Sequence, residues 1–467
     1  MDYKKRERVL APLGGHFLII LLLCIVIMGC TSSQTLGTTG SPPPASPTTR
    51  VIPTQGFTPH QIETATQEVS ATPSPQPSPT SGVFENELPL GEISYVLPLT
   101  ILQVNEHTAT LFFELDTPAS GSAFVRNVEN TSPIIEKPLS PGQVRHQLSF
   151  EGLEPGNRYE VLVALEDGAG GFQQPGFLSR IWGSVSFHTI AAKGELRFGV
   201  IGDASFGDSL TEALLQQMMI YDLDFILHCG DVVDETEWGM DPFESYAMKY
   251  YKTFEPILTR MPVYKVPGNH DYDEDIRWQG EPFYYYAFPP FATPNFPHQA
   301  DNTRNQYYAF EQRGIQFMML DSQVLFGASG REEQDHWLSE RLMDPNFLIT
   351  IPVFHVSPFS SSSVHPTDSL PVRRVWVPMF EEAKVPLVFS GHFHQYERLF
   401  SQGVTYIVSG GGSSVTYASG PFIAESQVFA RKTHFVLVEV DGTALRLTAI
   451  ALGGEIIDQV ELSLDEF

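Results

Sequence analysis

Five short polar blocks in the second half of the chain carry side chains that bind metals. They are Gly202-Asp203, Gly230-Asp231, Gly268-Asn269-His270-Asp271, Phe354-His355 and Gly391-His392-Phe393-His394. Carboxylate, amide and imidazole ligands without thiolates suit Mn, Fe or Zn, rather than a soft metal or a structural zinc site. A glycine before a ligand lets the backbone turn sharply and lets an ion come close. The blocks therefore predict a metal centre.

Each block follows a hydrophobic segment typical of a buried strand. These segments are residues 196–201, 224–229, 263–266, 348–354 and 386–389. Helical patterns alternate with them at 210–221, 332–342 and 372–382. Further strands are expected at 315–320, 404–408, 435–440, 445–450 and 455–462. This alternation indicates an α/β domain with a β-rich end. In open α/β sheets the carboxyl ends of the strands face one crevice, so we expect the five blocks to converge there.

The preceding segment, residues 89–190, has the two-residue alternation of β-strands. The alternation is clearest at 109–115, 159–165 and 185–189. The string from Leu153 to Tyr159 looks like the turn before a tyrosine corner, in which a phenol caps backbone at a strand connection. The segment resembles a fibronectin type III-like β-sandwich. It contains no cluster of metal-binding side chains, so we expect a packing or spacer domain.

The N-terminal residues are typical of an exported lipoprotein. Four basic residues precede an apolar run from Phe17 to Met28, which is too short to span a bilayer comfortably but fits a signal peptide. The run ends in Gly29-Cys30 and resembles a bacterial lipobox, in which the Cys is lipid-modified. An ordinary signal peptide or anchor with an incidental Cys is the alternative. Residues 31–88 are rich in Pro and Thr, which predicts an extended, disordered linker after the signal peptide of residues 1–30.

Composition limits the partners of the chain. Its 467 residues include 55 acidic and 28 basic side chains, and the formal net charge is −27. Such a chain offers no basic face for nucleic acid, and we expect membrane contact only through the lipid anchor, on the outer face of the cell membrane. An acidic enzyme can still take an anionic substrate if its site holds cations. With Cys24 removed and Cys30 lipidated, Cys229 has no disulfide partner.

The five blocks, in this order, resemble the signature of calcineurin-like metallophosphoesterases. More narrowly, the chain is similar to purple acid phosphatase-like proteins, through the fibronectin-like segment and the strings at 307–310, 320–322 and 394–398. The resemblance runs from about residue 90 to the C-terminus. It implies a multidomain α+β/α/β chain, in which a β-sandwich precedes a four-layer α/β/β/α domain at 195–467. It also implies two metal ions and hydrolysis of a small phosphate ester by a metal-bound hydroxide.

The resemblance further implies a ligand for each position of the metal centre. The ligands would be Asp231 as the bridge, Asp203 and His394 on one ion, and Asn269, His355 and His392 on the other.

Three more residues are candidates for proton transfer by the same resemblance. His270 would face the substrate, and either stabilise the transition state or protonate the leaving oxygen. Asp271 would orient the His270 ring, with a turn-forming carboxylate as the alternative. His365 lies ten residues after His355 in a Ser-rich loop and is a second candidate donor, unless it is simply a solvent-exposed loop residue.

Two positions depart from the family pattern. Ser205 stands where many metallophosphoesterases have His, and Asp234 stands where purple acid phosphatases have a ligating Tyr. The first metal ion would then be completed by the Asp234 carboxylate or by water. The identity of the ions, Fe, Mn or Zn, therefore stays open.

The leading hypothesis is a surface-anchored, acid phosphatase-like phosphomonoesterase with a dinuclear metal centre. A phosphodiesterase or nucleotidase of the same family is the first alternative. The altered first metal site motivates a second one, a degenerate relative that binds metal or phosphate without turnover. An adhesion lipoprotein acting through its fibronectin-like domain is the third.

Overall fold

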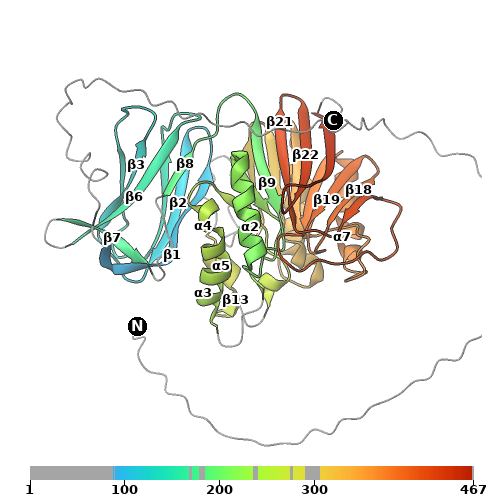
Figure 1. Cartoon of the computed structure of the whole chain (residues 1–467), viewed down its shortest axis with the longest axis horizontal. Coiled ribbons are helices and arrows are strands. Elements are labelled where there is room, and N and C mark those ends of the chain that lie inside the picture. Colours follow the sequence, from blue (N-terminus) through green and yellow to red (C-terminus); the bar gives the residue numbers. More distant parts are fainter. Residues whose placement is uncertain are drawn as a thin grey trace, which may run out of the picture. The chain divides into compact units, whose positions relative to one another are not determined.

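The computed structural model describes residue 88 and residues 90–167, 171–177, 185–234, 240–273, 277–289 and 306–464 (Figure 1). The predicted signal peptide, Cys30 and most of the linker lie outside these residues. Within the described part of the chain, no helix is both long and apolar enough to cross a membrane.

Residues 90–188 form an all-β region with its own apolar core. Its strands are β1 (Leu90–Val104), β2 (Thr108–Leu115), β3 (Gly121–Asn127), β4 (Ile135–Pro138), β5 (Arg145–Glu151), β6 (Arg158–Glu166), β7 (Phe172–Phe177) and β8 (Val185–His188). They pair in the order β4-β3-β6-β7-β1-β2-β5, and β8 also pairs with β6. The Tyr159 phenol accepts a hydrogen bond from the Glu154 backbone N–H at 2.7 Å, as the tyrosine-corner prediction requires. The fibronectin type III likeness of this region stays a prediction.

The first sheet of the following domain combines parallel and antiparallel strands. The strands are β9 (Leu196–Ile201), β10 (Phe225–His228), β11 (Val263–Lys265), β21 (His434–Asp441), β22 (Ala444–Ala451) and β23 (Ile456–Ser463). Their order is β11-β10-β9-β21-β22-β23. The first three are parallel to one another, whereas β21 runs antiparallel to β9. The carboxyl ends of β9, β10 and β11 therefore lie at one edge.

A second mixed sheet has seven strands. They are β14 (Tyr308–Gln312), β15 (Ile315–Met319), β16 (Ile349–Val356), β17 (Leu387–Gly391), β18 (Tyr396–Ser401), β19 (Val404–Ser409) and β20 (Ser426–Ala430), in the order β14-β15-β16-β17-β19-β18-β20. The parallel run β15-β16-β17-β19 carries the second set of blocks. A separate hairpin pairs β12 (Arg277–Trp278) with β13 (Glu281–Pro282).

Helices complete the domain. They are α2 (Ser209–Met218), α3 (Pro242–Ser245), a π-helix (Tyr246–Tyr251), α4 (Lys252–Leu258), α5 (Phe283–Ala287), α6 (Arg331–Leu342), α7 (Ser369–Val375) and α8 (Val377–Glu382), with 3₁₀ turns at Met219–Tyr221, His270–Tyr272 and Ser322–Phe326. The single helix predicted at 372–382 is two helices, because Pro378 has no N–H to donate to the preceding turn. The predicted helix at 210–221 ends in a 3₁₀ turn.

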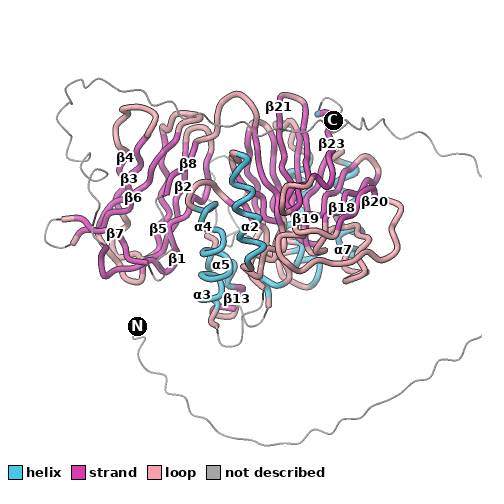
Figure 2. The backbone as a smooth tube through the Cα atoms, viewed as in Figure 1, coloured by secondary structure: helices cyan, strands magenta, loops and turns pink. Residues whose placement is uncertain are grey.

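The two sheets face each other between two helical layers. The Phe198 ring of β9 contacts Phe317 of β15, with ring centroids 5.3 Å apart, so these faces share one core. The opposite face of β9 lies against α2, because a Cβ on Gly199 would be 2.6 Å from the Met218 methyl. The outer face of the second sheet packs against α6, α7 and α8 through Trp337 and other apolar side chains. Figure 2 distinguishes these helices from the strands by colour.

Candidate metal centre

The ends of five strands bring the predicted metal-binding side chains together. Asp203 follows β9, Asp231 follows β10, and Asn269 follows β11 in the first sheet. In the second sheet, His355 lies near the end of β16 and His392 comes directly after β17. The prediction of convergence is confirmed by the hydrogen bonds and short contacts that join these residues.

The backbone is strained at the ligand positions. Asp203, Asp231 and His392 have φ angles of 58°, 51° and 69°, in the left-handed region that non-glycine residues rarely adopt. Such strain persists only when the surrounding structure fixes it, and it is common at functional sites. The preceding glycines leave room for the carboxylates. A Cβ on Gly268 would lie 2.1 Å from Asp231 Oδ1, and one on Gly391 would lie 2.5 Å from Asp203 Oδ2.

One group of donors consists of Asp203, Asp231 and His394. One potential ligand atom from each lies within 4.8 Å of the others, and all three residues are buried. His394 Nε2 is 3.3 Å from Asp203 Oδ1. In the described part of the chain, neither carboxylate forms an ion pair with Lys or Arg. Because buried carboxylates are costly without a positive partner, this group suits a cation.

The second group consists of Asn269, His355 and His392. Asn269 Oδ1 lies 2.9 Å from His392 Nδ1 and 3.0 Å from His355 Nε2. His355 Nε2 is also 3.3 Å from Asp231 Oδ1, so Asp231 belongs to both groups. The Nδ1–H of His355 donates to the Cys229 carbonyl at 2.8 Å, which directs the Nε2 lone pair toward the other donors.

These separations are those expected for ligands of a common ion. Ligands about 2.1 Å from a metal lie about 3.0 Å apart in an octahedron and about 3.4 Å apart in a tetrahedron. The contacts of both groups fall between 2.9 and 3.3 Å. The donor set therefore fits metal binding, with Asp231 common to both groups.

The charges of these groups depend on one another. Burial alone would lower the pKa of His355, but the charge and hydrogen bond of Asp231 outweigh it and raise the pKa to about 9. Burial alone would raise the pKa of Asp231, but the charge and hydrogen bond of His355 outweigh it and lower the pKa. In the metal-free site Asp231 therefore stays ionised beside a protonated His355, and an ion that binds His355 Nε2 must displace the proton there.

His270 lies beside this centre and is held by two carboxylates. Its Nδ1 is 2.9 Å from Asp234 Oδ1 and 2.8 Å from Asp273 Oδ2. Its backbone N–H donates to Asp231 Oδ1 at 3.0 Å, which ties it to the bridging residue. Since both carboxylates engage Nδ1, Nε2 is the nitrogen available to a substrate. Asp273 was not among the predicted site residues, although it lies three residues after His270.

Two sequence-based assignments need correction here. Asp271 does not orient His270. Its carboxylate accepts from the backbone N–H groups of Gly268, Val232 and Val233 at 2.8, 3.1 and 3.3 Å. The Tyr246 phenol donates to it at 3.2 Å. Asp271 is fully buried and stabilises the loop through these backbone hydrogen bonds. This agrees with the alternative prediction of a turn-forming carboxylate.

Asp234, expected as a ligand of the first ion, contacts His270 instead. Among the described residues, Asp234 forms a cluster with His270 and Asp273. This cluster is separate from the one formed by Asp203, Asp231 and His394. The physical reason is the positive charge that His270 can carry, which attracts the Asp234 carboxylate.

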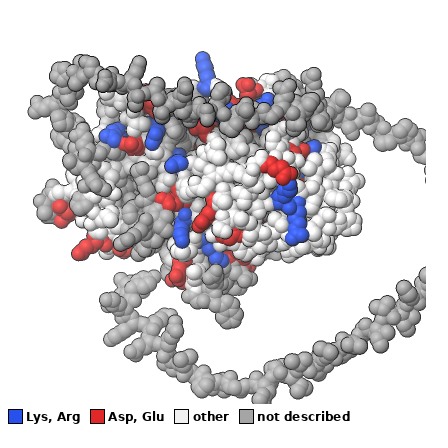
Figure 3. Space-filling view, in the orientation of Figure 1, with Lys and Arg blue, Asp and Glu red and all other residues white. Residues whose placement is uncertain are grey.

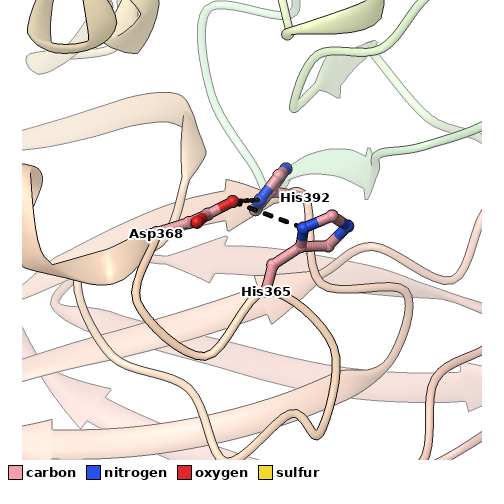
Figure 4. A group of neighbouring side chains, drawn as sticks. All are labelled: His365, Asp368 and His392. Carbon is pink, nitrogen blue, oxygen red and sulfur yellow. Dashed lines mark hydrogen bonds and ion pairs between the residues drawn. The ribbon is translucent and has the colours of Figure 1, made fainter. Parts of the chain in front are cut away.

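His365 lies beside His392, with their ring centroids 5.1 Å apart. Its Nδ1 is 3.5 Å from Asp368 Oδ2, and the same oxygen is 3.0 Å from His392 Nε2 (Figure 4). His365 therefore lies at the edge of the centre, although its side chain is 46% exposed to solvent. Asp368 was not predicted, although it too follows a candidate His by three residues.

Tyr417 is a further neighbour that sequence reasoning missed. Its ring stacks on His394, with centroids 4.2 Å apart and planes 5° apart, and its backbone N–H donates to the His394 carbonyl at 2.8 Å. The loop around it is tied to the His365 loop by the bridge between Ser362 and Ser419. Nothing in the sequence pattern marks Tyr417, because the loop that carries it has no regular period.

Comparison with known proteins agrees with this geometry. Residues 196–396 match the family model of calcineurin-like phosphoesterases. That range contains every residue of the two donor groups. This part of the chain is therefore similar to calcineurin-like phosphoesterases.

Individual relatives are similar at low identity. Purple acid phosphatase 23 of Arabidopsis thaliana is 24% identical over 304 residues, which cover 58% of this chain and 62% of that protein. Probable purple acid phosphatase 20 of the same plant is 26% identical over 228 residues, or 46% of this chain and 48% of that protein. The chain thus spans less than two thirds of either relative. The solved structure of GAP50, the anchor in the inner membrane complex of Plasmodium, is 18% identical with a TM-score of 0.45, over 58% of this chain and 89% of its own.

Proposed function

We propose that this protein is a phosphomonoesterase with a dinuclear metal centre, similar in chemistry to acid phosphatases. The observation that carries the proposal is the shared position of Asp231, whose Oδ1 lies 3.3 Å from His355 Nε2 while its carboxylate also belongs to the cluster with Asp203 and His394. Two ions at such a site would lower the pKa of a water molecule and neutralise the charge of a phosphate ester.

The residues of the chain would contribute orientation and a proton. Asp203 also fixes the backbone of the next ligand, since its carboxylate accepts from the His392 N–H at 2.9 and 3.1 Å. His270 is held in one orientation through Nδ1, so its Nε2–H can hydrogen-bond a phosphoryl oxygen or protonate the leaving alkoxide. His365 is the second candidate for that proton transfer.

Hydrolysis of p-nitrophenyl phosphate tests the proposal. The purified protein is stripped of metal with a chelator and then supplied with Mn²⁺, Fe³⁺ or Zn²⁺. We expect activity only after metal is returned, and none for Asp231→Ala under the same conditions, which controls for hydrolysis by free ions. Activity that survives complete removal of metal would refute the proposal. Bis(p-nitrophenyl) phosphate, used in parallel, distinguishes a phosphodiesterase from a monoesterase.

A second candidate function is binding of metal or phosphate without turnover. It is favoured by the contact of Asp234 with His270, because that contact leaves the first group with Asp203, Asp231 and His394 alone. Calorimetry with inorganic phosphate on the metal-loaded protein, combined with no hydrolysis in either assay, would support this candidate.

We also propose that the protein is exported and held on the outer face of the membrane by lipid on Cys30. The apolar run and the Gly29-Cys30 junction support this. Acidic and basic side chains are interspersed on the face shown in Figure 3, and the net charge of −27 makes nucleic acid an unsuitable partner. Protein expressed in bacteria should partition into detergent, and Cys30→Ser should abolish lipid attachment. An unmodified N-terminus elsewhere, found by mass spectrometry, would contradict the proposal.

A further inference from the structure

Asp368 lies between two imidazoles at the edge of the metal centre. Its Oδ2 is 3.0 Å from His392 Nε2 and 3.5 Å from His365 Nδ1, and Figure 4 shows both contacts converging on the one carboxylate. The side chain of His392 is 8% exposed, whereas that of Asp368 is 33% exposed. The carboxylate therefore closes the solvent side of a nearly buried ring.

The contact to His392 has a consequence for the proton on that ring. A neutral imidazole carries one N–H, and a carboxylate can only accept a hydrogen bond. Asp368 at Nε2 therefore places the proton there and leaves the lone pair on Nδ1. Nδ1 is the atom that lies 2.9 Å from Asn269 Oδ1, within the second donor group. Carboxylates act in this way on metal-binding histidines, by fixing the tautomer and the ring orientation.

The position of Asp368 in the chain argues against a purely structural role. It is the residue before α7, where an Asp commonly caps the helix by accepting from the N–H groups of the first turn. Here its side chain makes no capping hydrogen bond. It is turned toward the two histidines instead. A turn in which the Asp368 N–H donates to the His365 carbonyl at 3.2 Å brings both side chains to this place.

The main chain of His392 is held independently of its ring. The backbone N–H donates to Asp203, whereas the ring lies between Asn269 and Asp368. Loss of Asp368 would therefore free the ring without releasing the backbone.

We infer that Asp368 is a positioning residue that presents His392 Nδ1 to the second metal ion and holds His365 beside the substrate. The inference rests on the proposed metal centre but not on turnover. If it holds, one carboxylate couples a metal ligand to a candidate proton donor.

The test measures Zn²⁺ binding to the full-length, metal-free protein by competition with a chromophoric chelator. We expect Asp368→Ala to weaken the second Zn²⁺ equivalent about 10–100-fold, the usual effect of losing such a partner, and to leave the first equivalent unchanged. Asp368→Asn keeps an oxygen that can accept from Nε2–H, so it should restore most of the affinity. Glu333→Gln removes one exposed negative charge on α6 and serves as the charge-matched control.

Two further measurements separate the remaining outcomes. The thermal midpoint of metal-free Asp368→Ala should equal that of the wild type, whereas a fall in that midpoint with unchanged Zn²⁺ affinity would overturn the inference. His365→Ala should still bind two equivalents. A third equivalent in the wild type that is lost in His365→Ala would show that His365, Asp368 and His392 form a cation site of their own, and would also overturn it. Zn²⁺ affinity is measured without substrate, so weakened binding in a protein that hydrolyses no ester would refute only the proposed function.

Discussion

Replacing Asp271 by Asn should destabilise the protein while sparing the chemistry of the site. The wild-type carboxylate is fully buried and accepts from three backbone N–H groups and one phenol. Its Oδ2 receives the Gly268 and Val232 N–H groups, and its Oδ1 receives the Val233 N–H and the Tyr246 hydroxyl. An Asn side chain keeps one acceptor oxygen and has an NH₂ donor in place of the other.

The magnitude follows from which contacts an Asn can keep. With its oxygen at the Oδ2 position, Asn retains the two shorter backbone bonds, and its NH₂ can donate to a rotated Tyr246 hydroxyl. The Val233 N–H then faces another donor, and one buried polar group left in this way costs about 1–3 kcal/mol. Asp271→Ala removes the acceptor from all four donors. At the same cost for each, the loss is comparable to the whole free energy of unfolding of a typical domain, about 5–15 kcal/mol, so this variant should not accumulate in folded form.

The assay is urea denaturation of the metal-free protein, followed by kcat on the folded, metal-loaded fraction. Asp273→Asn is the matched control, because its side chain is 34% exposed and contacts the His270 ring. We expect Asp271→Asn to lower the denaturation midpoint with a small effect on kcat. Asp273→Asn should lower kcat with a small effect on the midpoint. An unchanged midpoint with a large loss of kcat for Asp271→Asn would show that Asp271 acts on His270 after all.

Four further predictions concern the chemistry of the centre. Asp231→Ala should lose both metal ions and all turnover, as measured by metal analysis of the purified variant, because it removes the donor common to both groups. His270→Ala should slow hydrolysis by ~10²–10⁴-fold with its metal retained; metal loss as complete as for Asp231→Ala would refute the assigned role. Burial alone would lower the pKa of His270, but the hydrogen bonds of Asp234 and Asp273 raise it to about 12, so its imidazolium persists through neutral pH and is lost only as pH rises through that value. Asp273→Asn should therefore move the alkaline fall of kcat/KM to lower pH. Oxidised, iron-loaded protein should show no intense tyrosinate band, because position 234 is Asp and Tyr417 is stacked on His394; a strong band that Tyr417→Phe abolishes would contradict this.

The core strands of residues 195–467 were predictable because most of their residues are apolar. The segments expected at 196–201 and 435–440 are β9 and β21, with boundaries shifted by no more than one residue. The strands β14, β18 and β20 were not predicted. All three lie toward the edges of the second sheet, where strands mix polar and apolar residues, as in Tyr396–Ser401. Periodicity therefore found all six strands of the first sheet, including its edge strands β11 and β23, and missed three strands toward the edges of the second sheet.

The metal-binding set was predictable for a related reason. Parallel strands place their carboxyl ends at one edge, so Asp203, Asp231 and Asn269 needed only their strands to be found. Pairing across the two sheets was not predictable from spacing, since it depends on how the sheets face each other. Tyr417 reaches His394 through that arrangement.

The carboxylates that contact His270 and His365 both lie three residues after the histidine, at Asp273 and Asp368. Asp271 and Asp273 are the same residue type, two positions apart, and the sequence-based interpretation chose the nearer one. Residues 270–272 form a 3₁₀ turn, in which side chains three positions apart lie on the same side. Asp273 therefore meets the His270 ring, while Asp271 points into the buried interior. The same spacing places Asp368 beside His365 in the other loop, through the hydrogen bond from the Asp368 N–H to the His365 carbonyl. Where a candidate His opens a tight turn, the carboxylate three residues later is thus a better candidate for orienting the ring than its immediate neighbour.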